Sequence, residues 1–334
     1  MPLSLPSLLP ERLRSRLERG CALRAAGYCG RYAPSPSGAL HWGNLRTALL
    51  SWLDARLAGG QWLLRMDDLD TPRVVTGAEE RIVADLSWLG LSWDGPLLRQ
   101  SERRGFYSDV LSALRRAGAL YPCRCSRRLL ADVSAPHGPL SVYPGFCRGL
   151  PPRWGPVEGR LPSWRLRVGA DQLRWGERLA EPGELDAGSA VGDVVLRRAD
   201  GYIAYHLATA LDELELGISD VVRGADLWAA TAAQVAVMQQ LGVAPPRYGH
   251  VPLWRDAAGQ RLSKRDGSAG LDAARQRGDD APAVIAQLAA SLALVPEGSR
   301  LSATELLEEL RRRHSDLPPG ADRLATALAA CAKT

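Results

Sequence analysis

A histidine that follows a loop rich in proline, serine and glycine is the first candidate for chemistry. The loop runs from Tyr32 to Gly38, and His41-Trp42-Gly43-Asn44 comes next. Apolar residues at helical spacing then predict a helix from Asn44 to Leu57. A helix N-terminus binds phosphate through its free N–H groups and positive dipole end, and His41 could add a hydrogen bond. Gly43 would let a flat base approach the backbone. The alternative is an ordinary turn with a surface histidine.

A lysine in a short basic segment is the second candidate. Lys264 lies in Arg261-Leu262-Ser263-Lys264-Arg265, after a turn at 256–259. Of 42 lysines and arginines, only Lys264 and Lys333 are lysine. A chain that otherwise uses arginine suggests that a compact, mobile ammonium is required here. Such a group can swing onto a transferring phosphate. The alternative is a solvated run of charge, against which the lysine usage argues.

Three of the six cysteines form a local cluster in the sequence, Cys123, Cys125 and Cys147. Three thiolates with a fourth nitrogen or oxygen ligand suit tetrahedral zinc, and ligand chemistry favours His137 as the fourth. The alternative is three buried free thiols. The scattered spacing is unlike a disulfide scaffold and predicts a reducing compartment, the cytoplasm.

The elements that must position these groups begin in the order strand, loop, helix, strand, helix. The apolar run 62–66 predicts a buried strand that leads into Asp67-Asp68-Leu69-Asp70. A capping box, Thr76 to Glu79, predicts a helix to about Leu89, and Ser101 opens another to about Ala117. This order favours a parallel α/β architecture.

Periodicity is poor from Tyr121 to about Gly188, which predicts an irregular inserted module that contains the cysteines. Regular structure returns with strands at 194–197 and 202–205. Helices are then expected at about 204–216 and at 227–241, the second with Asp226 as its N-cap. After Gly270 the chain is helical, with a second capping box at Ser302 to Glu305.

The composition is that of a soluble globular protein: 334 residues, 46% hydrophobic and 24% charged. No apolar run approaches the ~20 residues of a membrane span. Arginines interrupt residues 1–28, so a secretory signal is not expected. These observations exclude membrane-spanning and secreted classes of protein. A net charge of +5 mildly favours a polyanionic partner such as RNA.

Together, the two candidate segments resemble the HIGH and KMSKS signatures of class I aminoacyl-tRNA synthetases. More specifically, four segments resemble the glutamyl-tRNA synthetase family in chain order, and the likeness covers roughly residues 30–270. They are Arg31-Tyr-Ala-Pro-Ser-Pro-Ser-Gly38, Arg65-Met-Asp-Asp-Leu-Asp70, Val222-Arg-Gly-Ala-Asp226 and Arg261-Leu-Ser-Lys-Arg265. The resemblance implies an α/β fold, a Rossmann-type parallel sheet split by a zinc-containing insertion and followed by a short helical region. The implied organisation is a leader of uncertain order at 1–28, the two halves of the catalytic domain at 29–120 and 191–270, an acceptor-type insertion at 121–190 and the helical region at 271–334.

The resemblance implies an adenylate-forming ligase. The carboxylate of L-glutamate attacks the α-phosphate of ATP, with Mg²⁺ on the phosphates, and no protein nucleophile is needed. No Walker-type loop is present. The implied catalytic residues are His41 and Lys264. The ATP-binding residues would be His41, Gly43, Asn44, Ser263 and Lys264.

For glutamate, the resemblance implies a binding site built from several segments: Arg31, Tyr32, Ala33, Pro34, Ser35, Asp67, Tyr205 and Arg223. Arg223 would bind the side-chain carboxylate in a bidentate manner. Asp67 stands where the family has glutamate; it would hold the substrate ammonium with a side chain one methylene shorter. Taken singly, Tyr205 could be a core aromatic and Arg223 a member of a surface ion pair.

The resemblance also gives a different fourth zinc ligand. Tyr143, four residues before Cys147, occupies the family's ligand position, so the implied set is Cys123, Cys125, Tyr143 and Cys147, with His137 as the rival. One structural zinc ion per chain is expected.

Length separates two branches of the family. Only 70 residues follow Lys264, too few for a large anticodon-binding region. This resembles the short glutamyl-Q tRNA(Asp) synthetases, which esterify glutamate to queuosine in the anticodon of tRNA-Asp. The expected partners are therefore L-glutamate and queuosine-containing tRNA-Asp, with no membrane, and we expect a monomer. The alternatives are a truncated glutamyl-tRNA synthetase that charges a 3′ end, a non-catalytic zinc-stabilised RNA-binding module, and a nucleotidyltransferase acting on a small acid.

Overall fold

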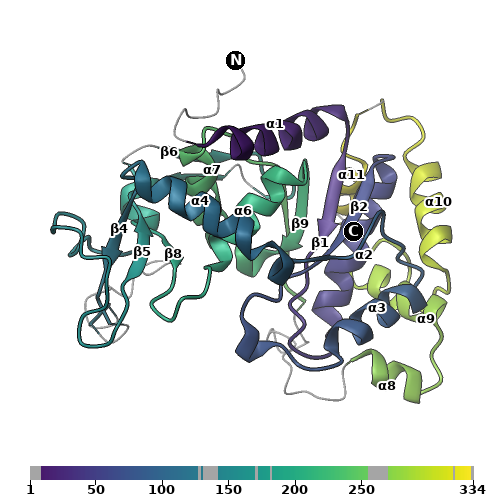
Figure 1. The fold of residues 1–334 in the computed structure, drawn as a ribbon. Coiled ribbons are helices and arrows are strands. Elements are labelled where there is room, and N and C mark those ends of the chain that lie inside the picture. The colour runs from purple at the N-terminus through teal and green to yellow at the C-terminus, as the bar shows by residue number, and fades with distance from the viewer. Residues whose placement is uncertain are drawn as a thin grey trace.

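Strands that are distant in the sequence lie side by side in a parallel α/β core. The computed structural model describes residues 9–126, 129–130, 142–169, 172–180, 183–254, 270–318 and 320–331. Strand β1 (Cys29–Tyr32) pairs in parallel with β2 (Gln61–Met66), and β2 pairs with β3 (Leu98–Arg99). Strands β9 (Asp220–Gly224) and β10 (Arg247–Val251) form a second parallel pair, and β9 lies beside β1 (Figure 1). The expected parallel architecture is confirmed.

The first helices follow the predicted order, with a correction at one cap. Helix α2 (Trp42–Leu57) connects β1 to β2, two residues longer than predicted at its start. After the short 3-10 turn η1 (Thr71–Arg73), α3 (Ala78–Trp88) begins without the predicted Thr76–Glu79 capping box. Its N-cap is Gly77 at φ 77°, and Glu79 instead binds Arg99. The left-handed backbone that glycine adopts so readily starts this helix in place of a side-chain cap.

The insertion is more regular than predicted. A 3-10 turn, η2 (Gln100–Arg103), leads into α4 (Arg104–Arg116) and β4 (Leu120–Cys123). Strand β5 (Ser163–Leu166) pairs antiparallel with both β4 and β8 (Val195–Arg197). Strands β6 (Gln172–Trp175) and β7 (Gly183–Asp186) form a second antiparallel pair, and the π-helix η3 (Ala187–Val191) follows β7. Strands of three or four residues are too short to give a readable alternation of polarity.

Two further local predictions are wrong. No strand forms at 202–205: Ile203 makes one isolated bridge with Arg197, and the chain enters α6 (Tyr205–Glu215) at once. Helix α7 (Trp228–Gln240) follows the 3-10 turn η4 (Ala225–Leu227), so its N-cap is Leu227 rather than Asp226.

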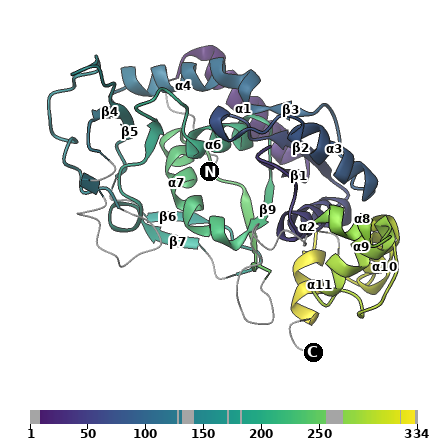
Figure 2. The same cartoon turned by 90° about the horizontal axis from the view of Figure 1, so that it is seen from below.

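The C-terminal region is helical, as predicted. It contains α8 (Leu271–Gln276), α9 (Ala281–Ala290), α10 (Ala303–Arg313) and α11 (Arg323–Cys331). Helices α9, α10 and α11 contact α2, and Figure 2 shows this group gathered beside it. The predicted Ser302–Glu305 capping box is present at the start of α10.

Residues 11–26, before β1, form an ordered helix, whereas the sequence alone leaves the order of this part of the chain open. Helix α1 (Glu11–Ala26) packs along α6, and Leu13 and Leu17 are buried. Gly20 allows very close approach, since a Cβ there would lie 1.9 Å from the carbonyl oxygen of Leu214. Helix α1 is therefore part of the packed domain.

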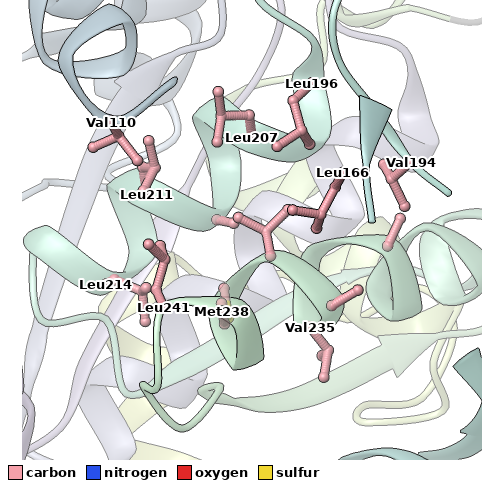
Figure 3. Packing of buried hydrophobic residues seen from close by; sticks show 14 of the residues in the cluster. Val110, Leu166, Val194, Leu196, Leu207, Leu211, Leu214, Val235, Met238 and Leu241 are labelled. Atoms are coloured by element: carbon pink, nitrogen blue, oxygen red, sulfur yellow. The ribbon is translucent and has the colours of Figure 1, made fainter. Parts of the chain in front are cut away.

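One hydrophobic cluster joins α4 and β5 to α6 and α7. Figure 3 shows Val110 of α4 and Leu166 of β5 packed with residues of α6 and α7, including Leu211 and Met238. Burial of this shared apolar surface fixes α4 and β5 against α6 and α7. Among the residues described, no helix has the length and apolar character needed to cross a membrane.

Candidate active site and cysteine cluster

A cavity of about 460 Å³ opens where the parallel strands end. Its walls come from the ends of β1, β9 and β10, from Asp67 directly after β2, and from the start of α2. Ligands of parallel α/β proteins bind at this edge of the sheet. The cavity brings together every predicted substrate-binding residue that the structure describes: Arg31, Tyr32, Ala33, Pro34, Ser35, His41, Gly43, Asn44, Asp67, Tyr205 and Arg223.

The two remaining predicted residues, Ser263 and Lys264, lie outside the described residues. The chain on either side of them is placed, however. Trp254, before this segment, lines the cavity, and Gly270, after it, forms an isolated bridge with His41. The segment that carries Lys264 thus leaves and rejoins the described structure at the cavity.

His41 caps α2 and is held in one ring orientation. Its Nδ1 accepts a hydrogen bond from the backbone N–H of Asn44 at 3.2 Å, and the Asn44 side chain accepts from the N–H of His41 at 3.4 Å. Because Nδ1 is the acceptor, the neutral ring carries its proton on Nε2. That tautomer can donate a hydrogen bond to a phosphate oxygen.

Arg31 and Asp67 both have buried partners within the protein. Arg31 donates from Nε and Nη2 to Glu213 Oε1, at 3.0 and 2.8 Å. Asp67 accepts from Arg65 Nε at 2.7 Å. Burial raises the pKa of Asp67, although the charge of Arg65 opposes the rise. A ligand ammonium at Asp67 would therefore share the carboxylate with Arg65.

Arg223 is buried, with 3% of its surface exposed, so it does not belong to a surface ion pair. Its nitrogens donate to four neutral groups: Nε to His250 Nε2 (3.2 Å), Nη1 to Gln234 Oε1 (3.0 Å), and Nη2 to both Thr231 Oγ1 (2.6 Å) and the carbonyl oxygen of Leu227 (3.4 Å). Among the described residues it forms no ion pair with a carboxylate. A buried guanidinium that none of the described carboxylates contacts is a site for an anionic ligand.

Tyr205 is 38% exposed and lines the cavity, so the alternative of a core aromatic is wrong.

Sequence reasoning missed Arg46, which lies on α2 between apolar residues. Burial lowers its pKa to about 10, and it packs over the ring of Trp254 at 5.2 Å. Asp226 also lines the cavity and was misread as a helix cap. For Arg46, the sequence did offer a signal: an arginine on the buried face of the predicted helix.

The cysteine cluster has the dimensions of a tetrahedral metal site. The sulfurs of Cys125 and Cys147 are 3.7 Å apart, and the Tyr143 hydroxyl lies 3.4 Å from Cys123 and 3.5 Å from Cys125. Zinc with bonds of about 2.3 Å to sulfur and about 2.1 Å to oxygen would separate its ligands by about 3.8 Å (S–S) and about 3.6 Å (S–O). These residues fit a zinc ion. The rival ligand, His137, lies outside the described residues.

The thiols of the cluster differ in acidity. Burial raises the pKa of Cys125 to about 11. The pKa of Cys147 is lowered, because burial is outweighed by hydrogen bonds from Tyr143 and its neighbours. Of these two thiols, Cys147 therefore becomes a thiolate more readily than Cys125.

The comparisons with known proteins agree with one another on the family. Residues 29–135 and 177–307 match the family described as tRNA synthetases class I (E and Q), catalytic domain. The glutamyl-Q tRNA(Asp) synthetase of Prochlorococcus marinus (strain MIT 9303) is 55% identical over 311 residues, which cover 93% of this chain and 97% of that protein. The glutamyl-Q tRNA(Asp) synthetase of Synechococcus sp. (strain CC9605) is 58% identical over 306 residues, covering 91% and 97%.

A solved structure agrees. The fold resembles the glutamate tRNA ligase from Elizabethkingia meningosepticum CCUG26117 in complex with its amino acid, with a TM-score of 0.70 and 26% identity. The match covers 84% of this chain but only 64% of that longer ligase, just under two thirds. The family match, the full-length relatives and the fold lead to one conclusion: the chain belongs to the glutamyl-Q tRNA(Asp) synthetase family of class I tRNA synthetases.

Proposed function

We propose that the protein activates L-glutamate with ATP and transfers the glutamyl group to the queuosine base in the anticodon of tRNA-Asp. The observation that carries the proposal is Arg223, a buried cation on the cavity wall without a carboxylate partner among the described residues. A guanidinium in this setting favours an anionic side chain of the substrate. The acceptor itself is proposed from the names of the full-length relatives. The same proposal places the protein in the cytoplasm.

Substrate orientation follows from the cavity walls. The side-chain carboxylate of glutamate would lie at Arg223 and its ammonium at Asp67, with Tyr205 at the open side. The α-carboxylate is then free to attack the α-phosphate of ATP. Holding both reactants in this geometry supplies much of the rate enhancement in such a reaction.

The phosphates of ATP would bind at the start of α2. His41, the N–H groups at the start of the helix and the ammonium of Lys264 would stabilise charge as pyrophosphate leaves. Mg²⁺ would enter with ATP as the counterion of its phosphates. The Cys123, Cys125, Tyr143 and Cys147 site would hold zinc to stiffen the insertion, away from the reacting atoms.

The test combines two assays. We expect glutamate-dependent exchange of pyrophosphate into ATP, lost in Arg223→Met and retained in the exposed control Arg312→Met. With labelled glutamate and queuosine-containing tRNA-Asp, cleavage of the RNA should leave the label on the anticodon fragment, and tRNA without queuosine should stay unlabelled. Label on the 3′-terminal adenosine would instead support a 3′-end-charging enzyme. Absence of exchange would support a non-catalytic RNA-binding module, and exchange without any labelled RNA a nucleotidyltransferase.

A further inference from the structure

Two buried residues, His250 and Glu177, lie next to Arg223 in the protein interior. His250 contacts Arg223, and Glu177 contacts His250 on its other side. Glu177 Oε1 accepts a hydrogen bond from the backbone N–H of His250 at 3.0 Å, and Glu177 Oε2 lies 2.6 Å from His250 Nδ1. The other ring nitrogen, Nε2, lies 3.2 Å from Arg223 Nε and 3.1 Å from Thr231 Oγ1, which also accepts from Arg223. The side chains of Glu177 and His250 are 0% and 1% exposed. Glutamate, imidazole and guanidinium thus form a relay within the protein interior.

The relay fixes which ring nitrogen carries the proton. Glu177 can only accept at Nδ1, so Nδ1 is protonated and Nε2 offers a lone pair to Arg223. Burial lowers the pKa of His250, and the nearby charge of Arg223 acts in the same direction. A neutral ring with an acceptor at Nε2 is the form that suits the Nε–H of Arg223.

The rest of the guanidinium is held from two further sides. Thr231 and Gln234 of α7 accept from its two terminal nitrogens, and the ring of Tyr248 lies under its face at 5.0 Å. The plane of the guanidinium is therefore set before a ligand arrives. Preorganisation of this kind strengthens binding, because less freedom is lost in the complex.

The interposed imidazole also preserves the charge of Arg223. The only carboxylate in the relay, Glu177, reaches Arg223 through a neutral ring and not by direct contact. Direct pairing with an acid would neutralise the cation that a substrate carboxylate needs. An amide substrate such as glutamine brings no charge to a buried cation, and its NH₂ group faces a group that can only donate.

We propose that Glu177 and His250 are positioning residues that orient Arg223, leave its charge unpaired and thereby set the preference for glutamate over glutamine. The proposal rests on the role given to Arg223 under the proposed function. It adds the residues that make Arg223 selective.

The test uses three variants at His250 and a structural control. We expect His250→Leu to raise KM for glutamate in pyrophosphate exchange by about ten- to hundredfold, the range for loss of a hydrogen bond to a charged group. KM for ATP and kcat should stay within about threefold. His250→Gln, which restores an acceptor, should recover most of the loss. His250→Glu, which pairs Arg223 directly, should lower the ratio of kcat/KM for glutamate over glutamine most. The control Val235→Ala opens the core of α7 and should lower stability while leaving both KM values unchanged.

A second readout does not depend on activity. In ¹⁵N-histidine-labelled protein, wild-type His250 should give the signals of a ring protonated at Nδ1, and Glu177→Met should lose them. The inference is overturned if folded His250→Leu keeps its KM for glutamate, or if Val235→Ala raises that KM equally. It is also overturned if the wild-type ring is protonated at Nε2. Failure of wild-type protein to exchange pyrophosphate with glutamate would overturn the proposed function instead, and the two failures are thereby separated.

Discussion

The imidazole of His41 lies against Gly43 in the first turn of α2. A Cβ at position 43 would be 3.1 Å from His41 Cε1 and 3.2 Å from Nδ1, closer than side chains ordinarily pack. A Cβ at position 43 would require the ring to shift by a few tenths of an ångström, which strains its hydrogen bond to Asn44. Glycine at position 43 thus leaves room for the orientation that the His41 ring adopts.

Gly43→Ala should therefore impair ATP use without unfolding the protein. Alanine favours helix by about 1 kcal/mol over glycine, which offsets strain from the displaced ring. We expect pyrophosphate exchange to fall about tenfold, the cost of one lost hydrogen bond of about 1.4 kcal/mol. The matched control is Gly105→Ala in α4, where a Cβ meets nothing within 4 Å. Equal activity of the two variants would contradict the coupling.

The cysteine cluster predicts a measurable metal content. Purified wild-type protein should contain one zinc ion per chain, and Cys125→Ser or Cys147→Ser should lose it, since both remove a soft thiolate ligand. Tyr143→Phe should bind zinc more weakly. Cys21→Ser, which alters a cysteine outside the cluster, should retain zinc. Absence of zinc from the wild-type protein, measured by metal analysis, would contradict the site.

Close packing of α1 on α6 predicts a severe effect at Gly20. Any Cβ there overlaps the carbonyl oxygen of Leu214, so Gly20→Val should lower the free energy of unfolding by about 2–3 kcal/mol in urea denaturation. The control is Gly27→Ala, because a Cβ at Gly27 has open space. Equal stability of the two variants would show that α1 does not pack on α6 in solution.

Gly20 also shows where sequence reasoning stops. Sequence patterns predicted an element correctly where neighbouring residues alone determine it. The capping box at Ser302 and the helix after His41 are examples. The patterns failed where tertiary contacts decide. Glu213 reads as an ordinary helix residue, yet the fold buries it against Arg31. The order of α1 likewise depends on a distant partner helix, since Gly20 packs against Leu214, and no local pattern reveals this contact.

The candidate site was predictable because four short segments resemble those of a known family. Its residues lie at the ends of β1 and β9, directly after β2, in the loop that follows β1, and at the starts of α2 and α6. The relay behind Arg223 was not, because Glu177 and His250 are 73 residues apart and each is unremarkable alone. Their pairing depends on how the end of the insertion meets β10, as the isolated bridge between Glu177 and Tyr248 shows.

Arg178 joins three parts of the fold and predicts a large stability effect. It donates twice to Asp54 of α2, at 2.7 Å each, twice to Asp322 at 2.6 and 2.7 Å, and once to Asp220 of β9 at 3.1 Å. Arg178→Met leaves buried Asp54 without a cationic partner, while Asp220 keeps its ion pair with Arg247; the loss should cost about 3–5 kcal/mol in unfolding experiments. The exposed pair of Arg174 with Glu184 is the control, and Arg174→Met should change stability by less than about 1 kcal/mol.

The Arg178 variant should also respond to pH in a defined direction. Burial already raises the pKa of Asp54, and loss of Arg178 removes the charge that opposes this rise. Protonation then relieves the unpaired carboxylate, so the deficit relative to wild type should shrink between pH 7 and pH 5. A deficit that is constant over this range would mean that the lost stability comes from packing and not from charge.

His206 predicts an acid-dependent loss of stability in the wild-type protein. Burial lowers its pKa from 6.5 to about 4, and the charge of Arg223 adds to the shift. Above pH 6.5 both folded and unfolded states are neutral at this ring, so its contribution is fully retained. Below pH 6.5 the unfolded state takes up the proton first, and stability falls until about pH 4. His206→Gln removes this group, so between pH 7 and pH 5 it should lose about 2 kcal/mol less than wild type in urea denaturation. His250, whose pKa is also lowered, should leave a residual dependence in the variant. Parallel curves for the two proteins would mean that the His206 ring is protonated as readily in the folded state as in the unfolded one.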